Sequence, residues 1–347
     1  MNIKLIFGIF FLIWTACLPP AAVAQTKDSI NTSASLLKSL KFDGAIKTKV
    51  ETSVEAGVTR FNVRNSRLGM RGDIGDYFSG RVQVELSNEG VFSPLDLYGV
   101  LKPSKNFSFL FGQQSIPFEN AYIITPAEMM FANRTFVGKY FTPGTRDIGA
   151  VIQYKCFSRF LPLEMQAGLF NGGKINDPQW TNQPSYAFRL IAGNMDGFRA
   201  SAKIYKYNSD RLNLLFWGAD VHYAGRRFRV EAEAMNRKSN TTGLDLFGTY
   251  IQGAYSFDCP AVRMFHVLTP ALRWDAMGYD VLNHGMDVNR LTAGLNFALS
   301  FIPYDSVLRF DYEQYFVRNG AKNFPDFDNR DPHVADNKIT LELVVRF

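Results

Sequence analysis

Apolar and polar residues alternate one by one in many segments of the chain after Phe42. Between Arg227 and Arg237, the even positions 228, 230, 232 and 234 are apolar, whereas the odd positions 227, 229, 231, 233 and 237 are charged. A period of two is typical of a β-strand with one apolar and one polar face. The same alternation recurs in segments at 82–86, 198–204, 291–301, 308–313 and 339–347.

Two kinds of all-β protein alternate in this way, the β-sandwich and the membrane β-barrel. The face opposite the charges carries Phe, Tyr, Trp and Leu in segment after segment, and the small polar face from Thr292 to Ser300 looks like the lining of a lumen. Aromatic residues at segment ends suit the interfacial girdles of a barrel: Tyr154, Tyr223, Phe257, Phe301 and Phe316. The pattern therefore favours a transmembrane antiparallel β-barrel, with the sandwich as the alternative.

Sixteen segments have the strand pattern. They begin near Phe42, Val58, Gly80, Leu95, Phe107, Arg146, Leu163, Tyr186, Phe198, Leu212, Arg227, Leu246, Val267, Leu291, Val307 and Lys338. An even number of strands brings both ends of a barrel to the same side of the membrane, and about sixteen strands leave an aqueous channel. We expect one barrel over residues 42–347.

The first residues resemble an export signal. Lys4 precedes an apolar run from Leu5 to Leu18, and Ala22-Val23-Ala24 is a small-residue cleavage pattern. We expect a signal peptide over 1–24 and a short segment over 25–41; an uncleaved anchor and a lipoprotein attached through Cys17 are the alternatives. All three readings export the chain.

The last residue, Phe347, ends an alternating segment from Lys338. This resembles the C-terminal assembly signal of outer-membrane barrels, which implies that barrel-assembly machinery and outer-membrane lipid are partners. The alternative is an ordinary terminal strand. We expect a bacterial outer-membrane location.

Charge and cysteine content narrow the function only a little. Cleavage removes Lys4 and no acidic residue, so the net charge falls from +6 to +5, and the charges are scattered instead of concentrated in a patch. This distribution argues against nucleic-acid binding. Cys156 and Cys259 are either a pair or two free thiols.

The chain carries no recognisable enzyme motif. An outer-membrane phospholipase needs a serine beside a histidine, and none of the four histidines, at 222, 266, 284 and 333, stands in such a motif. We therefore expect no enzymatic activity, no cofactor and no metal. A barrel for specific uptake and a mainly structural barrel remain open.

Several short motifs between Phe61 and Gly173 resemble the phosphate-selective porin family. They are, in order, Arg64-Asn65-Ser66-Arg67-Leu68-Gly69, Gly72-Asp73-Ile74-Gly75, Gly112-Gln113 followed by Pro117-Phe118-Glu119, Arg146-Asp147-Ile148-Gly149-Ala150 and Gly168-Leu169-Phe170-Asn171-Gly172. The resemblance implies a sixteen-stranded barrel, usually a homotrimer, that passes small solutes or anions such as phosphate. It also implies that one long loop folds into the lumen.

The stretch from Gln113 to Thr145 is the candidate for that loop, because it is the longest stretch without alternation and contains Pro117, Pro126, Pro143 and Gly144. A loop lying over the outer surface is the alternative. In the family a Lys is common at the position where this chain has Ser115, and acids accompany the cations on the lumen faces. We therefore expect weak anion selectivity.

The residues expected to attract anions are Arg134, Lys139 and Arg146, because residues 130–145 contain two of these cations and no acid, and the third follows directly. The wall cations Arg81, Arg199, Arg227 and Arg229 should contribute less, since Glu85, Glu231 and Glu233 share their faces. The alternative is that Arg134 and Arg146 fasten the loop to carboxylates such as Glu119, Glu128 or Asp147.

Overall fold

The computed structural model describes residues 37–88, 91–118, 124–158, 161–173, 175–209, 212–302, 305–318 and 331–347. The expected signal peptide at 1–24 and residues 25–36 of the expected N-terminal segment lie outside these ranges. The described residues fall almost wholly within one compact unit, Lys38–Phe347.

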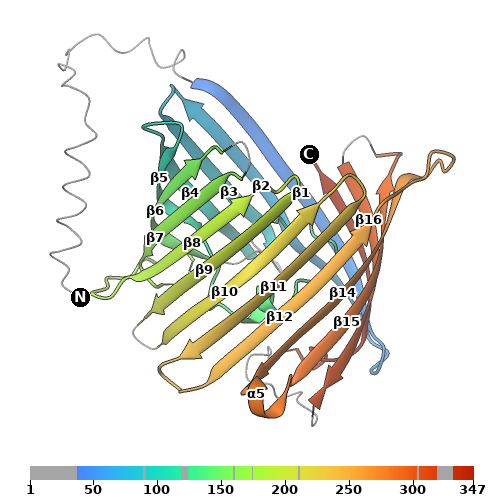
Figure 1. Cartoon of the computed structure of the whole chain (residues 1–347). Coiled ribbons are helices and arrows are strands. Elements are labelled where there is room, and N and C mark those ends of the chain that lie inside the picture. The colour runs from blue at the N-terminus through green and yellow to red at the C-terminus, as the bar shows by residue number, and fades with distance from the viewer. Residues whose placement is uncertain are drawn as a thin grey trace, which may run out of the picture. The chain divides into compact units, whose positions relative to one another are not determined.

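Long antiparallel strands make up nearly all of this unit (Figure 1). They are β1 (Leu37–Ser53), β2 (Thr59–Ile74), β3 (Phe78–Asn88), β4 (Val91–Leu101), β5 (Phe107–Ser115), β6 (Arg146–Cys156), β7 (Leu163–Phe170), β8 (Ser185–Gly193), β9 (Phe198–Asn208), β10 (Asn213–Ala224), β11 (Phe228–Ser239), β12 (Asp245–Tyr255), β13 (Phe257–Asp258), β14 (Phe265–Tyr279), β15 (Val288–Leu299), β16 (Asp305–Val317) and β17 (Lys338–Arg346). The two short helices are α4 (Phe136–Tyr140) and α5 (Val281–His284).

The sheet closes on itself. Each strand pairs with the next along the chain, except that β12 and β13 both pair with β14, and β1 pairs with β17 from Ala45↔Arg346 to Ser53↔Lys338. The short β13 continues β12 along β14, so the described residues form a closed barrel of sixteen strands. Each of the sixteen predicted segment starts lies within a strand or one residue before it, which confirms the predicted barrel.

The two faces of the wall differ as the alternation predicts. On β8, Phe188 is 42% exposed and Leu190 is 40% exposed on the outer face, whereas Arg189 between them is 1% exposed on the inner face. In a membrane barrel the outward apolar side chains meet lipid and the inward polar ones line the lumen.

A bulge in β2 changes which positions point inward. Asn65 has a positive φ of 59°, and the pairing with β3 shifts between Arg64 and Arg67. Before the bulge the exposed apolar residues are Phe61 and Val63; after it they are Leu68 and Met70, so the parity is reversed. The extra residue of a β-bulge has this effect, and it lets both Arg64 and Arg67 face the lumen.

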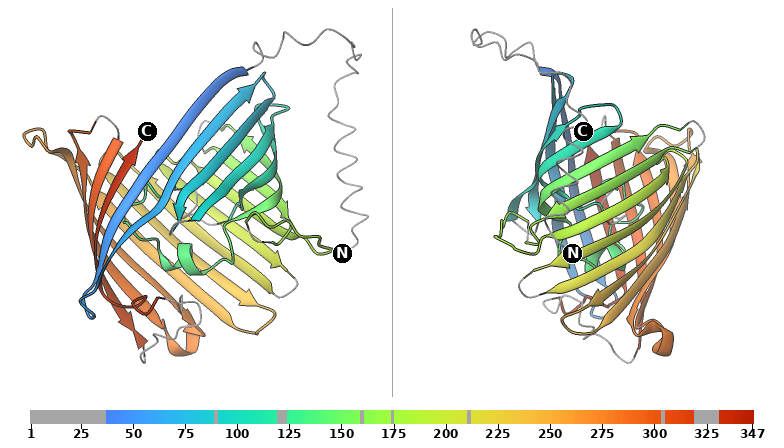
Figure 2. Two further views of the ribbon diagram at one scale, coloured as in Figure 1. Left: turned by 180° about the vertical axis from the view of Figure 1, so that it is seen from behind. Right: turned by 60° about the vertical axis from the view of Figure 1, so that its left-hand side comes forward.

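Residues 124–145, which lie between β5 and β6, fold into the barrel (Figure 2). They contain α4 and contact the inner wall over several strands. The predicted lumen loop is confirmed, and the alternative of an outer surface loop is wrong. No helix among the described residues is long and apolar enough to cross a membrane. Cys156 and Cys259 are both free thiols.

Candidate functional site in the lumen

The lumen loop, residues 124–145, packs on one half of the barrel wall. Phe136, Val137 and Phe141 are at most 1% exposed and belong to an apolar cluster with wall residues of β9 to β14, among them Phe216 and Met235. Burial of large apolar side chains stabilises each by about 1.5–3 kcal/mol. The loop therefore fills one side of the lumen.

Wall carboxylates hold the loop through its backbone N–H groups. The N–H of Ala132 donates to Asp311 at 2.7 Å, and the N–H of Phe136 donates to Asp275 at 2.8 Å. Thr135, the N-cap of α4, accepts from the N–H of Gly138 through its hydroxyl. Asp275 also pairs with Arg290 at 2.7 Å, so the wall, the loop and this ion pair are joined at one carboxylate.

Wall cations hold the same loop through its carbonyl groups. Arg309 donates to the Ala127 carbonyl at 2.7 Å, and Arg290 donates to the Arg134 carbonyl at 2.7 Å. The other such pairs are Lys47 with Pro126, Arg229 with Glu128, Arg273 with Asn133, and Arg237 with Tyr140 and Phe141. The mixed charges on β11 and β14 to β16 thus fasten the loop and form ion pairs with one another.

Between the loop and the wall formed by β17 and β1 to β3 lies a cavity of about 280 Å³, which we call the basic constriction. Among the described residues that line it are ten cations and four carboxylates. The cations are Lys47, Lys49, Arg60, Arg64, Arg67, Arg134, Lys139, Arg146, Arg290 and Lys338, and the carboxylates are Glu51, Glu85, Asp331 and Glu342. The described lining therefore carries more cations than carboxylates.

Part of the positive charge is paired. Arg60 lies 3.0 Å from Glu51, Arg67 lies 3.2 Å from Glu85, and Lys47 lies 3.1 Å from Glu342. A second cavity of about 500 Å³ shares Arg67, Arg134 and Arg146 with the basic constriction and adds Lys41, Arg71 and Arg81. The basic lining therefore continues along the wall, chiefly on β2.

The three residues expected to attract anions all line the basic constriction. Arg146, the first residue of β6, is buried and donates to Asp96 at 2.6 Å, which is not one of the carboxylates considered from the sequence. Asp147 instead accepts the N–H groups of Ile148 and Gly172, and Glu119 lies outside the described residues.

Lys139 lies in α4, and its ammonium group is 4.8 Å from the centre of the Tyr140 ring. Although the residue is exposed to the cavity, desolvation by the surrounding protein and then the positive charge of Arg64 lower the pKa of Lys139 to about 8. Further neighbouring cations with the same effect are Lys338, Arg290 and Lys49. Crowding of like charges disfavours the protonated amine.

The four predicted wall cations have different environments. Arg81 makes two bonds to Asp43, at 2.8 and 3.0 Å, and lines the cavity beside Arg71. Arg199 donates to Asp220 at 2.8 Å, and Arg229 pairs with Glu231. Arg227 lies in the turn before β11, is exposed and pairs with Asp258 at 2.7 Å.

Sequence reasoning missed the arginines of β2 as pore residues: Arg60, Arg64, Arg67 and Arg71. They do not follow a single alternation, because Arg60 and Arg64 are even-numbered and Arg67 and Arg71 are odd-numbered. The apolar residues change at the same place from odd positions (Phe61, Val63) to even positions (Leu68, Met70). This change in the sequence is the signal that could have indicated the bulge.

The surroundings of the histidines test the alternative that the protein is a phospholipase. His222 is buried, with Nε2 3.1 Å from the carbonyl oxygen of Met195 and Nδ1 3.3 Å from Glu231. His266, near the start of β14, has Nδ1 3.4 Å from the hydroxyl of Ser300 in an exposed contact. A serine nucleophile needs a third group to orient the histidine, and in the described part of the chain no carboxylate forms an ion pair with His266.

Comparisons with known proteins give matches only to solved structures. No family model matches the chain, and no curated protein does. Three similar structures are OmpF of Salmonella typhi in complex with daunomycin (14% identity, TM-score 0.63, 89% of this chain and 97% of that chain), the outer-membrane channel DcaP of Acinetobacter baumannii (15%, 0.58, 89% and 97%) and the trimer form of OmpT, an outer-membrane protein of Vibrio cholerae (12%, 0.60, 89% and 99%). Identities this low establish the fold alone: the chain has the architecture of outer-membrane porins.

Proposed function

We propose that this protein is a porin of the bacterial outer membrane, a water-filled channel through which small solutes diffuse passively with a weak preference for anions. The observation that carries the proposal is the basic constriction, where cations outnumber carboxylates by ten to four among the described lining residues. The acids of β14 and β16 reduce this excess at Arg290, which pairs with Asp275 and Glu313. Their other contacts include the loop backbone and Arg273, which is not among the described lining residues.

The expected preference is weak for a physical reason. Unit charges a few ångströms apart interact by about 1–4 kcal/mol in a partly solvated site, and salt screens charges beyond about 8–10 Å. Four carboxylates share the constriction, and Ser115 stands where the resembled family often has Lys. Phosphate is therefore one permeating anion among several, and neutral solutes pass as well.

Two further parts of the proposal concern assembly. A homotrimer is supported by the trimeric form of the similar Vibrio cholerae protein. Export as a mature chain that begins at Gln25, followed by assembly through Phe347, follows from the sequence. Extraction from the outer membrane as a heat-modifiable band with Gln25 at its N-terminus is the expected result, and recovery from the soluble periplasm would contradict it.

Reversal potentials in a salt gradient across a planar bilayer test the selectivity. The wild-type channel should prefer chloride, and the double variant Arg134→Gln, Lys139→Gln should lose about two- to fivefold in the anion-to-cation permeability ratio. The matched control is Arg227→Gln, because Arg227 is exposed in a turn and paired with Asp258. A wild-type preference for cations, or a double variant that behaves like the control, contradicts anion selectivity.

The same bilayer experiment separates the channel from its alternatives. A porin gives discrete ohmic current steps, whereas a structural barrel with a closed lumen gives none. A phospholipase would lose its hydrolytic activity on Ser300→Ala, the variant that removes the hydroxyl beside His266. We expect ohmic steps from both the wild type and this variant.

A further inference from the structure

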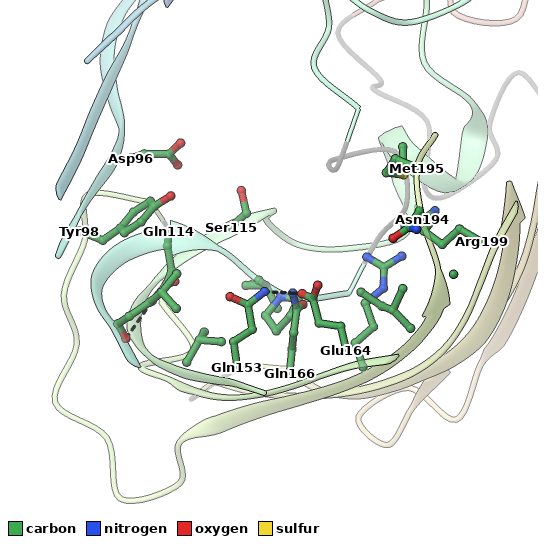
Figure 3. Close-up of a pocket in the computed structure, with 17 residues that line it drawn as sticks. Asp96, Tyr98, Gln114, Ser115, Gln153, Glu164, Gln166, Asn194, Met195 and Arg199 are labelled. Atoms are coloured by element: carbon green, nitrogen blue, oxygen red, sulfur yellow. Dashed lines mark hydrogen bonds between the residues drawn. The ribbon is translucent and has the colours of Figure 1, made fainter. Parts of the chain in front are cut away.

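A separate cavity of about 450 Å³ lies in the lumen along β4 to β9, and Asn194 and Met195 line it from the β8–β9 turn (Figure 3). We call it the amide cavity, because Gln114, Gln153, Gln166 and Asn194 line it, together with the hydroxyl groups of Tyr98 and Ser115. Its volume lies within the range of small-molecule sites, about 300–1,000 Å³. The short turns of an outer-membrane barrel face the periplasm.

The charges that line the amide cavity are balanced and internally paired. Arg189 and Arg199 both donate to Asp220, at 3.0 and 2.8 Å. Asp96 accepts from Arg146 at 2.6 Å, and Glu164 lies 3.5 Å from Lys155. Two cations and two carboxylates among the described lining residues leave no net charge, in contrast to the basic constriction.

Glu164 also orients two of the amides. The NH₂ groups of Gln153 and Gln166, on β6 and β7, both donate to Oε1 of Glu164, so the three side chains lie side by side on the floor of the cavity (Figure 3). A carboxamide offers two donors and one acceptor oxygen. With one N–H used on Glu164, each amide still has a carbonyl oxygen and a second N–H for a ligand.

Apolar side chains lie beside these polar groups. Leu110, Val151 and Ile191 line the same cavity from β5, β6 and β8. A cavity with paired donors and acceptors, an apolar wall and no net charge matches a molecule with hydroxyl groups on one edge and C–H groups on another. Each of its four lining charges has at least one oppositely charged neighbour, although both arginines share Asp220 with Lys203.

From this geometry we infer that the amide cavity is a binding subsite for a neutral hydroxylated solute of the size of a mono- or disaccharide. Hydroxyl groups donate and accept as carboxamides do, and the C–H face of a sugar ring packs on Leu110, Val151 and Ile191. The inference requires an open lumen but no particular ion selectivity. The protein would thus hold anions at the basic constriction and neutral polar solutes beneath it.

The test uses sucrose as the neutral probe, added to single wild-type channels in a planar bilayer. Sucrose should interrupt the chloride current with an affinity that does not change with salt. The double variant Gln153→Ala, Gln166→Ala should weaken this affinity about tenfold, because each removes hydrogen bonds of modest strength. Gln252→Ala is the matched control, since Gln252 lies on β12 and bonds to Glu231 outside the amide cavity.

A second variant, Ile191→Trp, fills the cavity while every amide stays in place, and it should abolish the interruptions. The chloride conductance and the reversal potential of each variant report whether the barrel has folded and whether the anion preference is unchanged. Calorimetry on the detergent-solubilised protein measures sucrose binding without any current. A protein that binds sucrose but does not conduct would contradict the channel proposal and leave the binding subsite intact. Absence of binding to the wild type, equal affinity in the double variant and the control, or an affinity that falls with salt would each overturn the inference.

Discussion

Phe347 and Gly44 close the barrel together. Their backbones exchange two hydrogen bonds, from the Gly44 N–H to the Phe347 carbonyl at 2.8 Å and back at 3.1 Å. The phenylalanine ring lies directly over the glycine, so that an added Cβ at Gly44 would be 2.5 Å from Cζ of the ring. Gly44 therefore provides the space that the terminal aromatic residue occupies on the outer wall.

Gly44→Ala should make barrel closure less stable, because the ring must move away from its present position. Phe347 is 51% exposed, so the cost should fall below the roughly 1–3 kcal/mol of overpacking in a closed core. The measurement is the temperature at which the folded band converts to the unfolded band on gels. Gly80→Ala is the control, since its Cβ would meet nothing nearer than 3.8 Å; equal temperatures for the two variants would contradict the role of this contact.

Phe347→Asp should reduce the amount of assembled protein far more than it changes the conductance of the channels that do assemble. A charge on the lipid face costs about 2–4 kcal/mol at mid-membrane and less at the interface, so loss of the assembly signal should dominate. Phe316→Asp, at an exposed position of β16, is the matched control. Normal membrane insertion of the Phe347 variant would show that this residue is only the end of a strand.

The anion preference should fall as the pH rises from about 7 to 9. The pKa of Lys139 is lowered to about 8, so its positive charge is present below this pH and is lost above it. Reversal potentials recorded at pH 6.5, 8 and 9.5 measure the change. The Lys139→Gln channel should show a smaller change over the same range, and an equal change in both channels would assign it to other groups.

Arg290→Ala should loosen the lumen loop and raise the single-channel conductance and its noise. Arg290 donates to the Arg134 carbonyl and pairs with Asp275 at 2.7 Å, and Asp275 in turn accepts from the N–H of Phe136. Removing one partner of a buried pair costs about 3–5 kcal/mol. Conductance traces identical to those of an Arg227→Ala channel would mean that the remaining contacts hold the loop without Arg290.

The sequence by itself determined the barrel. Alternation such as Phe188–Arg189–Leu190 is a local property, because successive side chains of a strand point to opposite faces whatever their partners are. The number of strands, the lipid and lumen faces and the extent of the long stretch between β5 and β6 could therefore be predicted residue by residue. The expected position of Arg134, Lys139 and Arg146 at the loop followed from the same local pattern.

Only the tertiary structure decided what the lumen charges do. Arg309 reaches the carbonyl of Ala127 and Asp311 reaches the N–H of Ala132, across sequence separations of 182 and 179 residues. No local pattern reports such contacts. From the sequence, the mixed charges of β16 looked like a pore lining in which acids offset the cations. In the structure they attach the loop to the wall. The bulge at Asn65 is an intermediate case: the parity of the apolar residues changes there in the sequence, but the pairing of β2 with β3 is what brings Arg64 and Arg67 to the same face of the wall.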